Sequence, residues 1–160
     1  MTEGRVFNTI FTENYARKEK KASPFLLVCP KCGAIQVDKR WYNDREILES
    51  KKRPHKDQLC PGCEAIKNGW IEGEIIMKNK IVNLVPGQIE NMIHNLENRL
   101  RHENPKNRII KIQKSKNQWK VSTASVFLAH QIGKELEKTY VSKVSYSFLK
   151  GDKFVRVVWE

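Results

Sequence analysis

The four cysteines of this chain occur as two closely spaced pairs, and this pattern limits the fold more than any other feature. The pairs are Cys29-Pro30-Lys31-Cys32 and Cys60-Pro61-Gly62-Cys63, with 27 residues between them. A two-residue gap lets both thiolates of a tight turn face one metal ion, and two such turns complete a tetrahedral four-sulfur shell. Gly33 allows the positive φ that such a turn requires. We therefore predict one structural zinc ion, held by Cys29, Cys32, Cys60 and Cys63.

Disulfide or redox chemistry of the two pairs stays open as an alternative to zinc. Each pair could form a disulfide, although a loop of two intervening residues restrains the unfolded chain little. One pair could also form a redox site, but a single pair suffices for that chemistry and the second would have no role. No cysteine lies outside the two pairs to act as a nucleophile.

The chain is strongly basic, with a formal net charge of +12 over 160 residues. Such a charge favours polyanions, above all nucleic acid, with an affinity that falls steeply as salt is added. A basic surface that only keeps the protein soluble is the alternative. No basic amphipathic helix indicates a membrane partner. Because no apolar run reaches the length of a signal peptide or membrane span, we expect a cytoplasmic protein with reduced cysteines.

Composition divides the chain into three predicted segments. Residues 1–24 are expected to form a flexible basic arm, which could become ordered on a nucleic-acid backbone or stay disordered without a function. Residues 25–69 are expected to form a zinc ribbon with a basic insert, including strands over 25–28 and 34–37 and a short helix over 44–49. Residues 70–160 are expected to form an α+β domain of the RNA-binding kind.

Alternation and helical spacing predict the elements of this last domain. Strands are expected over 70–77, 108–114, 119–123, 143–150 and 153–159. One helix of about 16 residues should begin near Pro86 and end before Asn104, and another should cover 125–140, capped by Ser125 or Thr123. This order predicts a split-βαβ, ferredoxin-like antiparallel sheet with two helices on one face. The other face would be open, as in many RNA-binding domains.

Basic side chains gather in two places. One is the run Lys51–Lys56, for which a solvated loop is the alternative, and the other is the stretch 104–134, which contains no acidic residue. Trp119 is the aromatic best placed to stack on a base, although a tryptophan in an alternating strand is more often part of the core. The predicted nucleic-acid contacts are Lys39, Arg40, Lys51, Lys52, Arg53, His55, Lys56, Arg108, Lys111, Lys114, Lys116, Trp119 and Lys120.

The sequence does not predict catalysis. Its four histidines are scattered, and no Ser-His-Asp set, paired carboxylates or glycine-rich phosphate loop can be identified. We therefore expect neither an enzyme nor a small-molecule substrate. A nucleic-acid-processing enzyme remains an alternative only if a partner or a second metal supplies the active site.

Short motifs over residues 26–159 together resemble a bacterial family of zinc-ribbon proteins. They are 29–34, Arg40-Trp41, 60–63, Gly73-Glu74-Ile75, 104–109, 121–134 and 155–159, although the family usually has two threonines where this chain has Ser122-Thr123-Ala124-Ser125. That family is similar to the zinc-binding N-terminal part of the archaeal and eukaryotic adaptor that binds the large ribosomal subunit and serves its nuclear export.

The resemblance implies that ribosomal RNA or a ribosomal subunit is the partner, with ribosomal proteins as further candidate contacts. We accordingly expect a zinc-stabilised, ribosome-associated protein that acts in assembly, hibernation or rescue. A zinc-ribbon transcription factor that binds DNA or RNA polymerase is the alternative.

Overall fold

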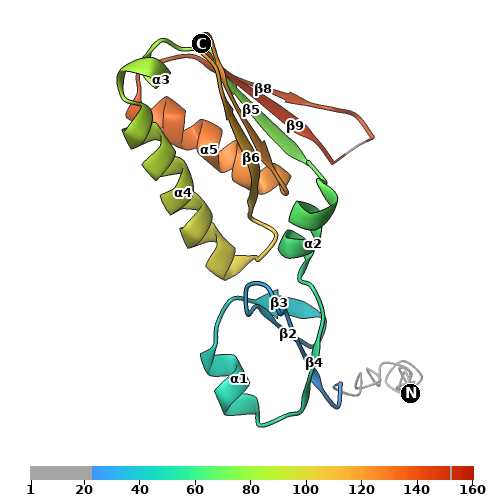
Figure 1. The fold of residues 1–160 in the computed structure, drawn as a ribbon. Coiled ribbons are helices and arrows are strands. Elements are labelled where there is room, and N and C mark those ends of the chain that lie inside the picture. Colours follow the sequence, from blue (N-terminus) through green and yellow to red (C-terminus); the bar gives the residue numbers. More distant parts are fainter. Residues whose placement is uncertain (1–22, 152) are drawn as a thin grey trace, which may run out of the picture.

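The computed structural model describes residues 23–151 and 153–160, and its strands form two sheets (Figure 1). The smaller sheet has the order β3-β2-β1-β4, and the larger has the order β6-β7-β5-β9-β8. The protein is therefore mixed α+β, as the sequence predicts. The expected basic arm lies outside the described residues, apart from Ser23 and Pro24. None of the described helices is long and apolar enough to cross a membrane.

The smaller sheet contains short strands around a small apolar core. Its elements are β1 (Leu26–Val28), β2 (Ile35–Val37), β3 (Arg40–Tyr42), α1 (Glu46–Lys51) and β4 (His55–Asp57). β1 pairs antiparallel with β2 and parallel with β4, and the buried side chains of Leu26, Ile35 and Val37 pack together. The strands and helix expected in this part are found within two residues of their predicted limits, whereas β3 and β4 are additional strands that the sequence pattern does not predict.

The rest of the chain forms the larger sheet and its helices. After α2 (Pro61–Asn68), the elements are β5 (Gly73–Met77), α3 (Ile81–Leu84), α4 (Pro86–Glu103), β6 (Ile109–Lys114), β7 (Trp119–Thr123), α5 (Val126–Thr139), β8 (Val144–Phe148) and β9 (Val155–Trp159). Pro86 occupies the first turn of α4, as expected. Ser125, rather than Thr123, caps α5, because its hydroxyl accepts a hydrogen bond from the backbone N–H of Leu128.

The main core lies between the larger sheet and the two long helices, which cover the same face (Figure 1). Alternate residues of β5, β7 and β9, such as Ile75, Val121 and Val157, point at buried positions of α4 and α5. Leu96 and Leu136 are both part of this core, as their helical spacing predicts. The layers lie close together at Gly133, where a Cβ atom would approach a side-chain carbon of Tyr146 to 2.8 Å.

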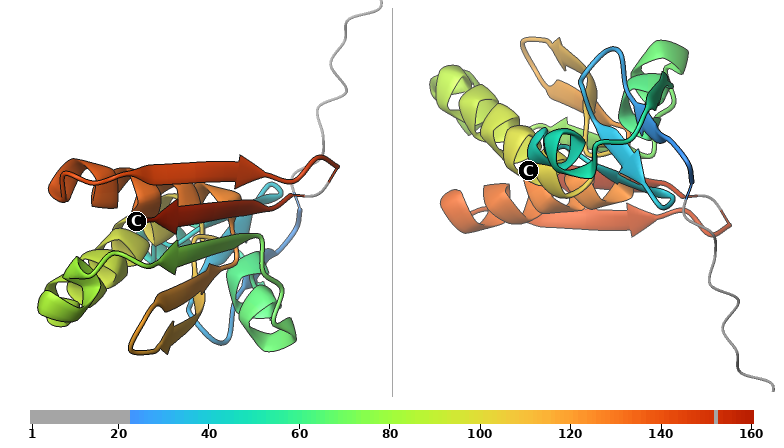
Figure 2. Two further views of the ribbon diagram at one scale, coloured as in Figure 1. Left: turned by 90° about the horizontal axis from the view of Figure 1, so that it is seen from above. Right: turned by 90° about the horizontal axis from the view of Figure 1, so that it is seen from below.

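The larger sheet is mixed, so the prediction of an antiparallel sheet is wrong at one pair of strands. β5 pairs parallel with β9, from Gly73 opposite Val155 to Met77 opposite Trp159. α5 leads into the outer strand β8, and the hairpin that follows returns β9 to the position between β8 and β5. Figure 2 shows these three strands side by side.

The sheet face opposite the helices carries polar side chains. Strand register places Glu74, Lys120 and Arg156 next to one another near its centre, and none of the aromatic residues in the described strands of this sheet lies on this face. Burial alone would raise the pKa of Glu74, but its ion pairs with Lys120 and Arg156 outweigh burial and lower it. The described strands of this face therefore provide no aromatic platform for stacked bases.

Candidate metal centre and nucleic-acid interface

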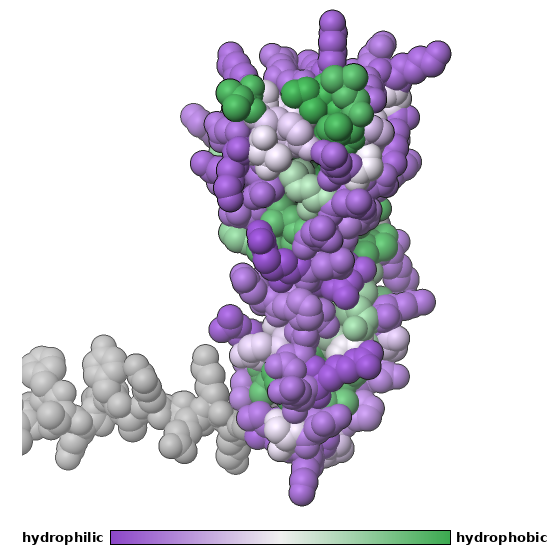
Figure 3. Space-filling model, turned by 90° about the vertical axis from the view of Figure 1, so that its left-hand side faces the viewer, coloured by the Kyte–Doolittle hydropathy of each residue, from purple (hydrophilic) through white to green (hydrophobic). Residues whose placement is uncertain are grey.

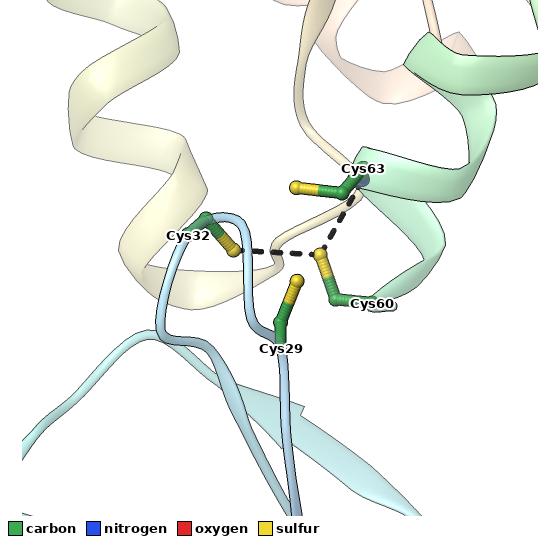
Figure 4. A group of neighbouring side chains, drawn as sticks. All are labelled: Cys29, Cys32, Cys60 and Cys63. Carbon is green, nitrogen blue, oxygen red and sulfur yellow. Dashed lines mark hydrogen bonds between the residues drawn. The ribbon is translucent and has the colours of Figure 1, made fainter. Parts of the chain in front are cut away.

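The four cysteine side chains converge on one point (Figure 4). Their Sγ atoms all lie within 4.8 Å of one another, and the Sγ atoms of Cys32 and Cys60 are 3.6 Å apart. In a tetrahedral shell with metal–sulfur distances of about 2.3 Å, neighbouring sulfurs are about 3.8 Å apart. All four cysteines are free thiols rather than disulfides. The group could therefore hold one metal ion, and the disulfide alternative does not describe this structure.

The first pair lies in a tight turn that follows β1. The backbone N–H of Gly33 donates to the carbonyl of Cys29 over 2.9 Å, and the N–H of Cys29 donates to the carbonyl of Ala34 over 2.7 Å. Gly33 has φ of +76°, in the left-handed region that favours glycine. The role predicted for Gly33 is confirmed, and the turn directs Cys29 and Cys32 toward the second pair.

The second pair lies at the beginning of a helix rather than in a second free turn. Cys60 is the N-cap of α2, Pro61 occupies the first turn, and Cys63 follows one turn later on the same side. The Sγ atom of Cys60 accepts a hydrogen bond from the backbone N–H of Cys63 over 3.4 Å. This helix holds both thiols in fixed positions, and the cysteine spacing alone does not predict it.

The cysteine thiols differ in how readily they ionise. Burial raises the pKa of Cys63 to about 11, and burial also raises the pKa of Cys60. Burial acts in the same direction on Cys29, but hydrogen bonds from the backbone of Cys60, Cys32 and Lys31 lower its pKa to about 7. A metal ion that binds here therefore displaces protons, so its affinity falls as the pH falls.

The metal centre packs directly against the segment that leads from α4 into β6. Gly62, between the two cysteines of the second pair, is so close to this segment that a Cβ atom would lie 2.0 Å from the carbonyl oxygen of Pro105. Arg108 continues the contact, with Nη1 4.0 Å from Sγ of Cys63 and Nε 3.4 Å from a carboxylate oxygen of Glu97 in α4. Arg108 thus connects the metal centre with the main core.

The cations of the metal-binding part form no ion pair with any described residue. This holds for every lysine and arginine between residues 25 and 69, although acidic side chains are also present there. Among the predicted contacts, Lys39 is in the β2–β3 turn with φ of +72°, and Arg40 lies over the ring of Tyr42. The run Lys51–Lys56 crosses from the end of α1 into the edge strand β4, where Lys56 lies over the ring of Phe25.

The cations predicted in the other part are largely neutralised. Lys114 pairs with Glu90 over 2.6 Å, Lys120 pairs with Glu74, and Arg108 pairs with Glu97. These acids lie outside the stretch 104–134, so its lack of acidic residues does not leave its cations unpaired. Lys111 and Lys116 are exposed and have no acidic partner among the described residues.

Trp119 is a core residue, which corrects its prediction as a stacking residue. It is 4% exposed and packs in the main core, because its position in β7 faces the helices. Trp70 is not among the predicted contacts, and the sequence pattern places it at the start of a strand over 70–77. That strand begins only at Gly73, and Trp70, directly after the glycine that ends α2, is 56% exposed. The feature of the sequence that could have indicated an exposed Trp70 is its position directly after Gly69, the glycine that ends α2.

No match to this chain is found among protein-family models, curated proteins or solved structures. Its function is therefore inferred from the chemistry of the metal centre and of the basic surface.

Proposed function

We propose that this chain is a zinc-stabilised protein that binds ribosomal RNA or a ribosomal subunit in the cytoplasm and does not itself catalyse a reaction. Its partner would be a ribosome in assembly, hibernation or rescue. The proposal has two parts, the identity of the metal and the binding of a polyanion, and separate observations support each. The choice of ribosomal RNA among polyanions rests on the family resemblance of the sequence motifs.

Zinc is the metal that suits the cysteine group best. Four thiolates at tetrahedral spacing favour zinc or an iron–sulfur cluster, and a single ion fits sulfur atoms that all lie within 4.8 Å of one another. Four protein ligands leave no coordination position for a substrate, which is typical of a structural site. The apolar residues packed on the cysteines are few, namely Ala34, Trp41 and Leu59, so the metal would supply much of the local stability.

One observation carries the RNA proposal: no lysine or arginine of residues 25–69 forms an ion pair with a described acid. Charges that form no ion pair remain available to phosphates, and binding then releases counterions from the nucleic acid. Figure 3 shows mostly hydrophilic residues on the face drawn, with its largest hydrophobic patch at the far end from the metal-binding part. Lys51, Lys52 and Arg53 form the densest cationic run.

A competition measurement tests the proposal. Zinc-loaded protein is bound to fluorescently labelled ribosomal RNA, and unlabelled structured RNA or duplex DNA of equal length is added. We expect RNA to compete at lower concentration than DNA, and replacement of Lys51, Lys52 and Arg53 by alanine to weaken binding and reduce its salt dependence. The matched control replaces three exposed lysines of the other part, namely Lys138, Lys143 and Lys150. Preferential competition by DNA would favour a transcription factor instead.

The relationship of the larger sheet to ferredoxin-like folds is also a proposal. The order β5-α4-β6-β7-α5 supports it, since β5 and β6 run in the same direction on either side of β7. On this view β9 is an additional strand inserted between β5 and β8.

A further inference from the structure

A cleft beside the metal centre combines cations with an apolar wall. It has a volume of about 660 Å³ and lies where α2 and the first cysteine turn meet the segment before β6. Its lining consists of Lys31, Cys32, Leu59, Cys63, Ile66, Lys67 and Arg108. We call it the junction cleft. Its volume lies within the range of sites that bind small molecules.

Cationic side chains outnumber carboxylates in the lining of the junction cleft. Three of the lining residues are cations and none is an acid. A zinc ion with four thiolates would carry two net negative charges, and Arg108, 4.0 Å from Sγ of Cys63, is placed to offset part of them. Lys31 and Lys67 are exposed and pair with no acid among the described residues, so they remain available to an anion.

Lys31 and Lys67 lie close in sequence to the cysteines, so the turn and the helix that carry the cysteines also set the backbone positions of both lysines. Lys31 lies between Cys29 and Cys32 in the first turn, and Lys67 follows Cys63 by about one helical turn in α2. The apolar part of the lining comes from Leu59 and from Ile66, which is 39% exposed. The cleft thus offers cations and an aliphatic surface next to each other.

We propose that the junction cleft binds one nucleotide of an RNA chain, with a phosphate between Lys31 and Lys67 and the base or ribose against Leu59 and Ile66. A nucleotide presents an anion and a flat, weakly polar surface close together, which matches this lining. The exposed Trp70, three residues after Lys67, provides an aromatic surface for a neighbouring base. The inference rests on the proposed RNA-binding function, and it adds that the junction cleft is where one nucleotide of the RNA is enclosed.

The test compares two double variants in the full-length, zinc-loaded protein. The probe is a fluorescein-labelled single-stranded RNA of 20 uridines, followed by fluorescence anisotropy over a series of salt concentrations. For K31A/K67A we expect the Kd to rise about tenfold and the salt slope to fall by about 0.7 units, since the two lysines share one phosphate and each phosphate contact contributes about 0.7. The control K138A/K150A removes two lysines that are also exposed and should leave both quantities unchanged. Zinc content is measured for each protein to show that the metal centre is intact.

A second variant separates the apolar wall from the charges. I66A should raise the Kd severalfold while the salt slope stays that of the parent, because no charge is removed. If K31A/K67A binds like the parent while replacement of Lys51, Lys52 and Arg53 abolishes binding, the junction cleft is refuted and the proposed function stands. If the parent protein binds neither this RNA nor ribosomal RNA at low salt, the proposed function fails and the cleft proposal fails with it.

Discussion

Replacement of Gly62 by alanine tests whether the metal centre packs on the main core as described. The new Cβ atom would lie 2.0 Å from the carbonyl oxygen of Pro105 and 2.8 Å from Cγ of Arg108. Carbon and oxygen atoms normally approach to about 3.3 Å, so the two backbones must separate by about 1.3 Å. Because the nearest obstacle is backbone, no side-chain rotation relieves the contact.

The expected loss of stability follows from two opposing terms. Overpacking of this kind destabilises by about 3 kcal/mol, and the higher helix propensity of alanine in α2 returns about 1 kcal/mol. The net loss of about 2 kcal/mol corresponds to a fall in Tm of about 4–8 °C. Thermal unfolding followed by circular dichroism at saturating zinc measures it. Weaker zinc binding should accompany it, since Gly62 separates two ligands.

Gly87 provides a matched control for this experiment. It also follows a proline in the first turn of a helix, but nothing lies within 4 Å of its Cβ position. Gly87→Ala should therefore leave the Tm unchanged or raise it. Helix propensity alone would increase the free energy of unfolding by up to about 1 kcal/mol. If Gly62→Ala also unfolds at or above the Tm of the parent, the packing of α2 against Pro105 is refuted.

The remaining predictions concern the proposed zinc ion, the main core and two single side chains. Removal of zinc by a chelator should increase hydrogen exchange in residues 25–69 before it does so in the main core, and uniform exchange in both would contradict this. Leu96→Ala should destabilise by about 2–5 kcal/mol in urea unfolding, because Leu96 is 5% exposed in the main core. Trp70→Ala should weaken RNA binding at an unchanged Tm, and a lowered Tm would indicate a packing role instead. Glu74→Gln should destabilise by about 2 kcal/mol at neutral pH. The pKa of Glu74 is lower in the folded protein than in the unfolded chain. The stability difference between the parent and Glu74→Gln is therefore fully present at pH values above the unfolded pKa, and it disappears as the pH falls through the folded pKa.

The elements of the larger sheet can be predicted from the sequence because each has a clear apolar period. α4 and α5 bury stripes at helical spacing, and the strands of both hairpins alternate around polar turns. The position of β9 cannot be predicted in the same way. The residues of β9 suit an edge strand and an inner strand equally well. Its parallel pairing with β5 follows only because the chain places β8 at the outer edge after α5, and the hairpin then returns β9 beside β5.

In the smaller sheet, β4 is harder to predict than β1 and β2 because backbone contacts rather than an apolar pattern hold it. β4 consists of exposed His55, Lys56 and Asp57, which have no hydrophobic period. The strand forms because the N–H of Leu26 donates to Pro54 and the N–H of Gln58 donates to Val28. α2 does have signals, namely Pro61 in its first turn and Gly69 at its end with φ of +65°, but a CxxC motif with proline is equally typical of a free turn.

For the site, the cysteine group that could hold a metal ion can be predicted from spacing alone, whereas the ion pairs that neutralise the predicted cations cannot. The acid-free stretch 104–134 suggests a bare cationic surface, but Glu74, Glu90 and Glu97 come from other elements and neutralise several of its cations. Ion pairs between residues far apart in sequence are invisible to a count along the chain. Acids are also present among the cations of residues 25–69, yet these cations lack acidic partners among the described residues.

Cosedimentation of the zinc-loaded protein with purified ribosomes over a range of salt concentrations, with sequencing of the RNA that it retains, tests the proposed function most directly. If the protein binds ribosomal RNA through its unpaired cations, it pellets with ribosomes at low salt, dissociates steeply as salt is raised, and enriches ribosomal RNA. A protein that contains its zinc and stays in the supernatant at every salt concentration, or that retains ribosomes without any dependence on salt, would contradict it.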